Sequence, residues 1–191
     1  MAKLILTPEN QIQRLNIILN RVELLQELPA EQLLKAPSKS WNSIEVLEHL
    51  SVAYSFYDSK IRKALDEVTD SNTESWSFKA RWWQQFVIEG QRPKGDKRPF
   101  KIKTLKRFEP LLQENELTPE KIRTIFERFF NSYGLLKTSV VESRNKCMKH
   151  KTFTSAIGPL VSFYLPEGFE FLICHAERHM VQIDTILASQ T

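Results

Sequence analysis

Residues 41–68 read WNSIEVLEHLSVAYSFYDSKIRKALDEV and repeat apolar side chains at helical spacing along their whole length. Asn42 and Glu45 form a variant of the capping box, in which an N-cap side chain is followed by an acid three residues later. The first half of the segment is apolar almost all round, which predicts burial on more than one side, as in the middle of a bundle. The main apolar stripe comprises Leu47, Leu50, Tyr54, Tyr57, Ile61, Leu65 and Val68.

Three further stretches, near residues 7–25, 118–140 and 166–188, carry the same helical period. The first two of them open with Thr-Pro-Glu, an N-cap followed by proline at the first helical position. A short helix is also expected at residues 30–34. The sequence therefore predicts an all-α fold with one domain over residues 1–191, a four-helix bundle with a long excursion between its second and third helices.

The irregular parts of the chain give weaker patterns. Inside the excursion, an aromatic-rich helix is expected at residues 78–87, and the alternation of lysine with apolar residues at 101–106 predicts a short strand. Residues 147–165 contain Gly158-Pro159 and are expected to be irregular.

Composition excludes several classes of protein. The 191 residues are 41% hydrophobic and 26% charged, as in an ordinary soluble domain. Apolar runs are only a few residues long, far short of the roughly 20 needed to span a bilayer, so no integral membrane protein is expected. The N-terminus lacks the apolar region of a secretory signal, so we expect a cytoplasmic protein.

Cys147 and Cys174 are too few for a disulfide framework and are expected to be unpaired core thiols.

Charge is concentrated in residues 92–107, where eight basic residues and one acid give +7 in a chain of net charge +4. Such asymmetry indicates a local surface that attracts anions. The aromatic stretch 76–86, with Trp82-Trp83, precedes this segment and is similar to platforms for single-stranded nucleic acid. No nucleic-acid motif is present, so that reading is the less favoured one. The alternatives are aromatics that pack the excursion onto the bundle beside solvated lysines, or a basic segment that steers a small anionic substrate.

The histidines give the strongest chemical signal. His175 and His179 are four residues apart, which places both rings on one helix face, and that face points inward. Buried imidazoles need partners, and either a shared metal ion or buried hydrogen bonds would supply them. If the two helices are neighbours, His49 completes a three-histidine site with an open position, which is the pattern of a catalytic metal centre. His150 lies in a lysine-rich turn and is expected to be solvated.

Other polar residues near these histidines have secondary roles at most. A zincin motif is excluded, because the general-base glutamate would stand at the position of Ala176. Glu177 points away from the site and is expected to be a solvated surface acid. Arg178 and Gln182 flank the inner face and could donate hydrogen bonds around the metal, or could equally form a salt bridge or hydrogen bond that stabilises the bundle. Glu45 could orient a ligand, although its capping role already explains it. No catalytic residue is assigned.

Two motifs resemble the DinB-like (YfiT-like) superfamily of metal-dependent four-helix-bundle proteins. Residues 41–50, WNSIEVLEHL, are similar to its Trp-x-x-x-Glu-x-x-x-His-Leu pattern, and residues 175–183, HAERHMVQI, are similar to its closing H-x-x-R-H-x-x-Q-I pattern. The segment from Arg92 to Pro110 looks like a loop found in one branch of the family. The match covers nearly the whole chain, and the closing motif is its most specific part.

The resemblance implies a bundle with an unusual helix order, often dimeric, and a divalent metal held by His49, His175 and His179. The family includes thiol-dependent S-transferases and isomerases and many members without known activity, and no motif here selects among these activities. We expect a small-molecule substrate, but the resemblance adds little about its identity. Three imidazoles suit zinc or nickel, but the ligands alone do not choose the metal.

The favoured hypothesis is a metal-dependent enzyme of thiol S-transferase or hydrolase type, in which the metal lowers the pKa of a bound water or of a low-molecular-weight thiol. The alternatives are a metal-free helical interaction module and a nucleic-acid-binding protein that uses residues 92–107.

Overall fold

The computed structural model describes residues 3–37, 40–100, 103–112 and 117–190, and it confirms the all-helical prediction. None of the helices in these ranges is long and apolar enough to cross a membrane. The helices are α1 (Pro8–Gln26), α2 (Ala30–Leu34), α3 (Ser43–Glu67), α4 (Trp82–Gln91), α5 (Pro119–Glu142) and α6 (Leu165–Ala188), together with the 3-10 turn η1 (Lys106–Phe108).

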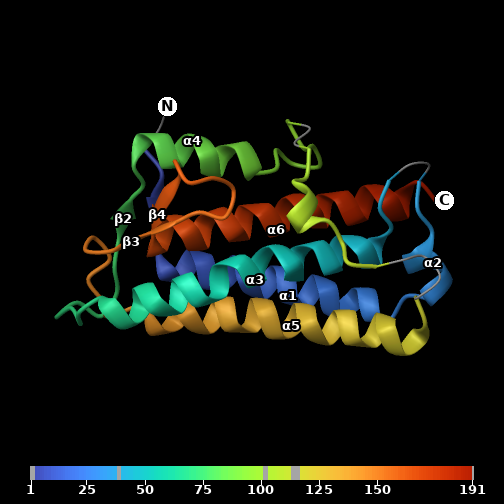
Figure 1. The fold of residues 1–191 in the computed structure, drawn as a ribbon, viewed down its shortest axis with the longest axis horizontal. Coiled ribbons are helices and arrows are strands. Elements are labelled where there is room, and N and C mark those ends of the chain that lie inside the picture. The colour runs from blue at the N-terminus through green and yellow to red at the C-terminus, as the bar shows by residue number, and fades with distance from the viewer. Residues whose placement is uncertain (1–2, 38–39, 101–102, 113–116, 191) are drawn as a thin grey trace.

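Four long helices, α1, α3, α5 and α6, form the bundle, with α4 lying alongside α6 on the outside (Figure 1). Helix α3 packs against α5 and α6, and α1 packs against the same two helices from the other side. The helices that follow one another in the chain, α1 and α3, are therefore not the closest neighbours, unlike in a simple up-and-down bundle. This order makes α3 and α6 adjacent, which is the condition for His49 to meet His175 and His179.

Hydrogen bonds at the helix starts explain why the long helices begin where they do. Asn42 Oδ1 accepts from Glu45 N at 2.9 Å and Glu45 Oε2 accepts from Asn42 N at 2.8 Å, which confirms the capping box. The hydroxyls of Thr7 and Thr118 each accept from the backbone N–H three residues on. The local sequence signals at these three starts are therefore sufficient to fix them.

Two parts of the excursion and one late segment differ from the sequence prediction. Helix α4 begins at Trp82, not at residue 78, because β2 (Phe78–Lys79) pairs with β1 (Ile5–Leu6). Residues 147–165 are not wholly irregular, since β3 (Thr152–Thr154) and β4 (Ser162–Tyr164) form an antiparallel pair. Of the strand expected at 101–106, residues 101–102 lie outside the described residues and the remainder forms no strand, with η1 starting at Lys106.

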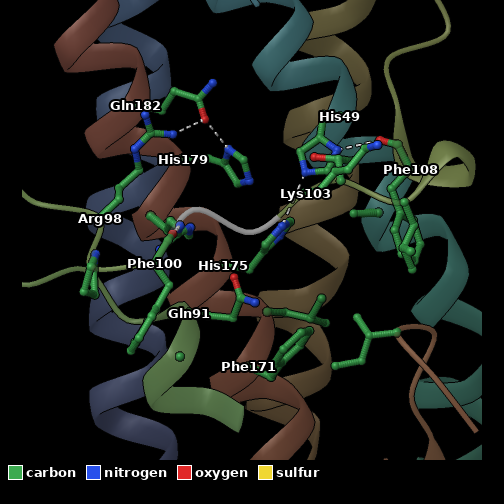
Figure 2. A pocket seen from close by; sticks show the side chains of 18 of the residues that line it. His49, Gln91, Arg98, Phe100, Lys103, Phe108, Phe171, His175, His179 and Gln182 are labelled. Carbon is green, nitrogen blue, oxygen red and sulfur yellow. Dashed lines mark hydrogen bonds between the residues drawn. The ribbon is translucent and has the colours of Figure 1, made fainter. Parts of the chain in front are cut away.

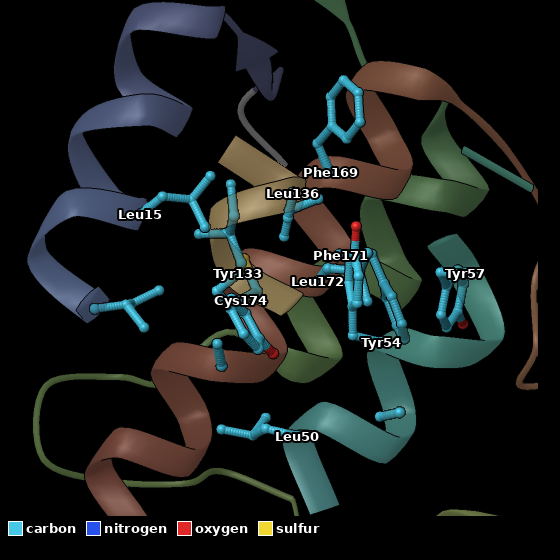
Figure 3. Close-up of a cluster of buried hydrophobic side chains, with 14 of the residues drawn as sticks. Leu15, Leu50, Tyr54, Tyr57, Tyr133, Leu136, Phe169, Phe171, Leu172 and Cys174 are labelled. Atoms are coloured by element: carbon cyan, nitrogen blue, oxygen red, sulfur yellow. The ribbon is translucent and has the colours of Figure 1, made fainter. Parts of the chain in front are cut away.

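The bundle core combines aliphatic and aromatic side chains from all four long helices (Figure 3). Tyr57 of α3, Tyr133 of α5 and Phe169 of α6 are almost completely buried. The rings of Phe129 and Tyr133 stack with centroids 4.5 Å apart. Of the two cysteines, both unpaired, only Cys174 is a core thiol, whereas Cys147 is half-buried.

Gly168, in the first turn of α6, is required by a close approach rather than by backbone conformation. A Cβ at this position would lie 2.3 Å from Cζ of the Phe153 ring. Alanine is the better helix former by about 1 kcal/mol, but overpacking a core costs about 1–3 kcal/mol. We expect Gly168→Ala to lower the free energy of unfolding by about 1 kcal/mol, measured by urea denaturation.

Gly134→Ala is the matched control, because a Cβ on Gly134 of α5 would meet nothing within 4 Å. The helix propensity of alanine should then raise the free energy of unfolding by up to about 1 kcal/mol. Equal shifts of the same sign in the two variants would contradict the assigned contact with Phe153.

Candidate metal centre

The three histidines singled out from the sequence converge between α3 and α6 (Figure 2). His49 comes from α3, and His175 and His179 come from successive turns of α6. Their ligand nitrogens all lie within 4.8 Å of one another, and the Nε2 atoms of His49 and His175 are 3.3 Å apart. This cluster could hold a metal ion.

A backbone carbonyl fixes the protonated nitrogen of His49. The Nδ1 atom of His49 lies 2.5 Å from the carbonyl oxygen of Phe108, at the end of η1. A carbonyl oxygen can only accept, so Nδ1 carries the proton and donates it, which leaves the lone pair on Nε2. That lone pair faces His175, where a cation would be shared.

Gln182 fixes the protonated nitrogen of His179 in a similar way. The Nη1 of Arg98 donates to Gln182 Oε1 at 2.7 Å, which identifies that atom as an oxygen. The same oxygen lies 3.0 Å from Nδ1 of His179, so Nδ1 carries the proton and donates it to the oxygen (Figure 2). The lone pair of His179 is therefore on Nε2, which can bind a metal. Two of the three rings are thus held in the tautomer that metal ligands use.

Burial keeps the cluster uncharged. Burial lowers the pKa of His175 to about 3, with His49 and Arg178 adding to the effect. Burial also lowers the pKa of His49, although its hydrogen bond to Phe108 opposes the shift. The pKa of His179 is lowered by burial and by the two neighbouring rings. All three imidazoles are therefore neutral near pH 7, which is the form that binds metal.

The donor set is chemically suited to zinc or another borderline divalent metal. Zinc–nitrogen bonds of about 2.0–2.1 Å in a tetrahedral site place two ligand nitrogens about 3.3–3.4 Å apart. The 3.3 Å between the Nε2 atoms of His49 and His175 matches this separation. With Nε2 of His49 unprotonated, Nε2 of His175 can either donate a proton to it or share a cation with it, so the contact is compatible with a bound metal.

The histidines lie on the wall of a cavity of about 1130 Å³ between the bundle and the excursion. Apolar side chains make up much of the lining, among them Trp41, whose ring is 5.0 Å from that of His49, and Phe171, whose ring is stacked parallel to that of His175. The volume is slightly above the usual range of small-molecule sites, about 300–1,000 Å³. A substrate could therefore reach the open side of the cluster.

Helix α4 and the segment that follows it, up to Phe100, line one side of this cavity, which we call its roof. A tight turn follows α4, in which Lys94 and Lys97 exchange backbone hydrogen bonds of 2.9 and 3.2 Å. Gly95 has a φ of +59°, a left-handed conformation that glycine adopts without strain. The turn sends residues 97–100 back across α6, where the backbone carbonyl of Phe100 accepts from Arg178.

A buried ion cluster joins this roof to the bundle. Glu170 of α6 is 1% exposed and accepts from Arg14 of α1 at 2.5 Å and from Arg92, just after α4, at 2.6 Å. Burial alone would raise the pKa of Glu170, but the two arginines lower it below its ordinary value. Sequence reasoning did not identify Glu170, because an acid on an otherwise apolar helix face carries no signal of its distant partners.

The other polar residues that the sequence placed near the histidines differ in what they contact. Gln182 contacts His179, as described, while Arg178 donates to the backbone of Phe100 and lines the cavity. Glu45 is engaged in its capping box. Glu177 points away from the histidines, but it is not simply solvated, since both its oxygens accept from Arg14 at 2.6 Å.

His150 is exposed on a turn, in agreement with the sequence prediction. It therefore lies among the surface residues and not in the histidine cluster.

The aromatic and basic parts of the excursion are divided between the cavity and the surface. Trp76 and Phe78 are buried, whereas Trp82 and Trp83 remain 81% and 44% exposed. Among the basic residues, Arg92 pairs with Glu170, and Arg107 donates to the carbonyl of Ala156. Others face the cavity: Lys97, Arg98 and Lys103 line it. The basic segment is therefore neither a uniform surface stripe nor fully solvated.

Comparison with known proteins identifies the fold. No protein-family model matches the chain, and no curated protein matches it in sequence. Among solved structures, it is similar to YfiT from Bacillus subtilis, described as a probable metal-dependent hydrolase with an unusual four-helix bundle topology. The match has a TM-score of 0.52 at 12% identity and covers 96% of this chain and 87% of that chain. The chain therefore has the YfiT-like fold.

Proposed function

We propose that this protein is a metal-dependent enzyme that acts on small molecules, with a divalent cation held by His49, His175 and His179. One observation carries the proposal: three neutral imidazoles from two adjacent helices meet on the wall of a large cavity. Three nitrogen ligands with one side open to the cavity are typical of catalytic and not of structural zinc sites. The likeness of the fold to a probable metal-dependent hydrolase supports the same class.

The bound metal, zinc or nickel, would lower the pKa of a water or a thiol so that it becomes a nucleophile near pH 7. The chain's own groups hold the imidazoles in place. Phe108 and Gln182 orient His49 and His179, and the parallel Phe171 ring limits the movement of His175. The apolar lining excludes water from the substrate body. Hydrolysis and thiol S-transfer both fit this arrangement. We also propose that the chain is a single domain, that it acts in the cytoplasm and that it forms a homodimer.

An activity assay tests the proposal. Zinc- and nickel-loaded protein would be incubated with a chromogenic ester, and separately with a low-molecular-weight thiol and a chromogenic electrophile. We expect turnover in at least one assay, its loss after the metal is stripped with a chelator, and its return when the metal is restored. Equal turnover by stripped and loaded protein would contradict a metal-dependent reaction.

Elemental analysis separates this proposal from a metal-free interaction module. About one zinc or nickel per chain is expected after purification in the presence of that metal. A chain that carries no metal under these conditions would favour the interaction module.

A further inference from the structure

Four cationic side chains line the cavity without a carboxylate partner. They are Lys97, Arg98, Lys103 and Arg178, and among the residues that the structure describes no ion pair joins any of them to an acid. Several arginines elsewhere do have an acidic partner. Arg81 pairs with the buried Glu167, and Arg128 pairs with the buried Glu48. The described residues that line the cavity include a single carboxylate, Asp96, so the four cations leave this lining with a net positive charge.

Arg178 is the most unusual of the four. Its residue is only 6% exposed, and although Nη2 donates to the carbonyl of Phe100, the buried Nη1 has no hydrogen-bond partner among the described residues. A buried guanidinium N–H without an acceptor costs more than an ordinary lost hydrogen bond, because the group is charged. An acceptor supplied by a ligand would remove that cost.

Arg98 provides a second guanidinium beside the first. Its only acceptor among the described residues is the neutral Gln182 Oε1, at 2.7 Å, so its charge also remains unpaired. Arg178 is close enough to Arg98 for the two charges to repel each other, which an anion between them would reverse. Lys97 and Lys103 are exposed on the same lining and extend the positive field outward.

These cations lie next to the histidine cluster. Gln182 Oε1 accepts from both Arg98 and His179, so one side chain separates Arg98 from a proposed metal ligand. Arg178 directly precedes His179 on α6. A group held by the two arginines would therefore leave the rest of a ligand within reach of the open side of the three rings.

We propose that Arg98 and Arg178 form an oxyanion subsite of the cavity, with Lys97 and Lys103 as its cationic rim. The substrate would then be a small molecule with a carboxylate, phosphate or sulfonate group attached to an apolar body. Guanidinium groups bind such oxyanions through paired N–H donors, and side chains such as Phe171 and Leu172 give the apolar body its surroundings. That the bound anion is part of a substrate rests on the proposed function, but binding to the subsite can be tested without metal.

Calorimetry on the metal-free protein is the direct test. The probes are hexanoate, hexan-1-ol as its uncharged counterpart, and inorganic phosphate. We expect hexanoate to bind at least about tenfold more tightly than hexan-1-ol, with phosphate competing for the same site and added salt weakening both. Equal affinity for hexanoate and hexan-1-ol would overturn the subsite.

Variants locate the charge that matters. Arg178→Gln and Arg98→Gln should each weaken hexanoate binding about tenfold or more, whereas Arg123→Gln, an exposed arginine of α5 that does not line the cavity, should not change it. Arg98 is exposed, so its variant is expected to fold even if Arg178→Gln does not. Wild-type affinity in a folded Arg98→Gln protein would overturn the assignment.

Two further outcomes separate this inference from its alternatives. Displacement of hexanoate by a single-stranded oligonucleotide would assign the cations to nucleic acid and overturn the small-molecule subsite. Zinc titration of the same samples tests the proposed metal-dependent function separately. Selective hexanoate binding without zinc binding would support the subsite and contradict the metal-dependent enzyme. Zinc binding without selectivity for hexanoate would support the metal site and overturn the subsite.

Discussion

Replacing His175 by alanine should lower zinc affinity by more than about 100-fold. Loss of a group that only orients a metal ligand typically costs 10–100-fold, and His175 is expected to be a ligand itself. Its ring nitrogen faces His49 at 3.3 Å, and its ring edge lies against His179 with centroids 4.6 Å apart. Two imidazoles would remain, one fewer than the three protein ligands of the proposed metal site. Competition with a chromogenic chelator measures the affinity.

His150→Ala is the control for this prediction, because it removes an exposed histidine from a turn and leaves the cluster intact. Zinc affinity should remain at the wild-type value. A His175→Ala protein that keeps its helical circular dichroism and binds zinc as tightly as the wild type would show that the metal is held elsewhere.

Replacing Glu170 by glutamine should lower the free energy of unfolding by about 3 kcal/mol, the lower end of the range for breaking a buried ion pair. The substitution keeps the size of the side chain but leaves Arg14 and Arg92 facing a neutral amide inside the protein. Arg14 retains Glu177 and Arg92 retains Glu89, which is why the lower end applies. Because Arg92 lies between α4 and the basic segment, the roof of the cavity should also loosen. Urea denaturation at pH 7 measures the loss.

The same carboxylate predicts part of the acid sensitivity of the protein. The pKa of Glu170 is lowered in the folded state, because the two arginines outweigh the opposing effect of burial. Its stabilising contribution is therefore complete above the unfolded value of about 4.3 and is lost as the pH falls through the folded pKa. Glu170→Gln should lack this part of the decline in stability below about pH 4.

Glu177→Gln is the matched control for Glu170, since it changes the other carboxylate of Arg14 at a side chain that is 24% exposed. Partly solvated ion pairs contribute about 0–1 kcal/mol. An equal loss of stability in the two variants would contradict the special role assigned to the buried carboxylate.

The long helices could be predicted from sequence because their signals are local. The capping box of Asn42 and Glu45 and the apolar stripe of α3 depend only on residues within the helix itself. The position of α4 could not be predicted in the same way. Trp82 and Trp83 extend an apolar pattern that begins at Phe78, yet they are exposed, and Phe78 belongs to a strand whose partner is more than 70 residues away.

The histidine cluster could be identified from sequence for a related reason. The spacing of His175 and His179 is local, and the buried half of α3 limited where His49 could point. The groups that orient the rings were harder to find. The carbonyl of Phe108 belongs to the backbone and carries no sequence signal, and Arg98 reaches Gln182 only because the turn at Gly95 reverses the chain.

Anomalous diffraction from crystals of the zinc-loaded protein is the sharpest test of whether three imidazoles from α3 and α6 share one metal ion. We expect one zinc peak between the rings, about 2.0–2.1 Å from a nitrogen of each of His49, His175 and His179. A map without a peak at this place, or with zinc bound only at other residues, would contradict it.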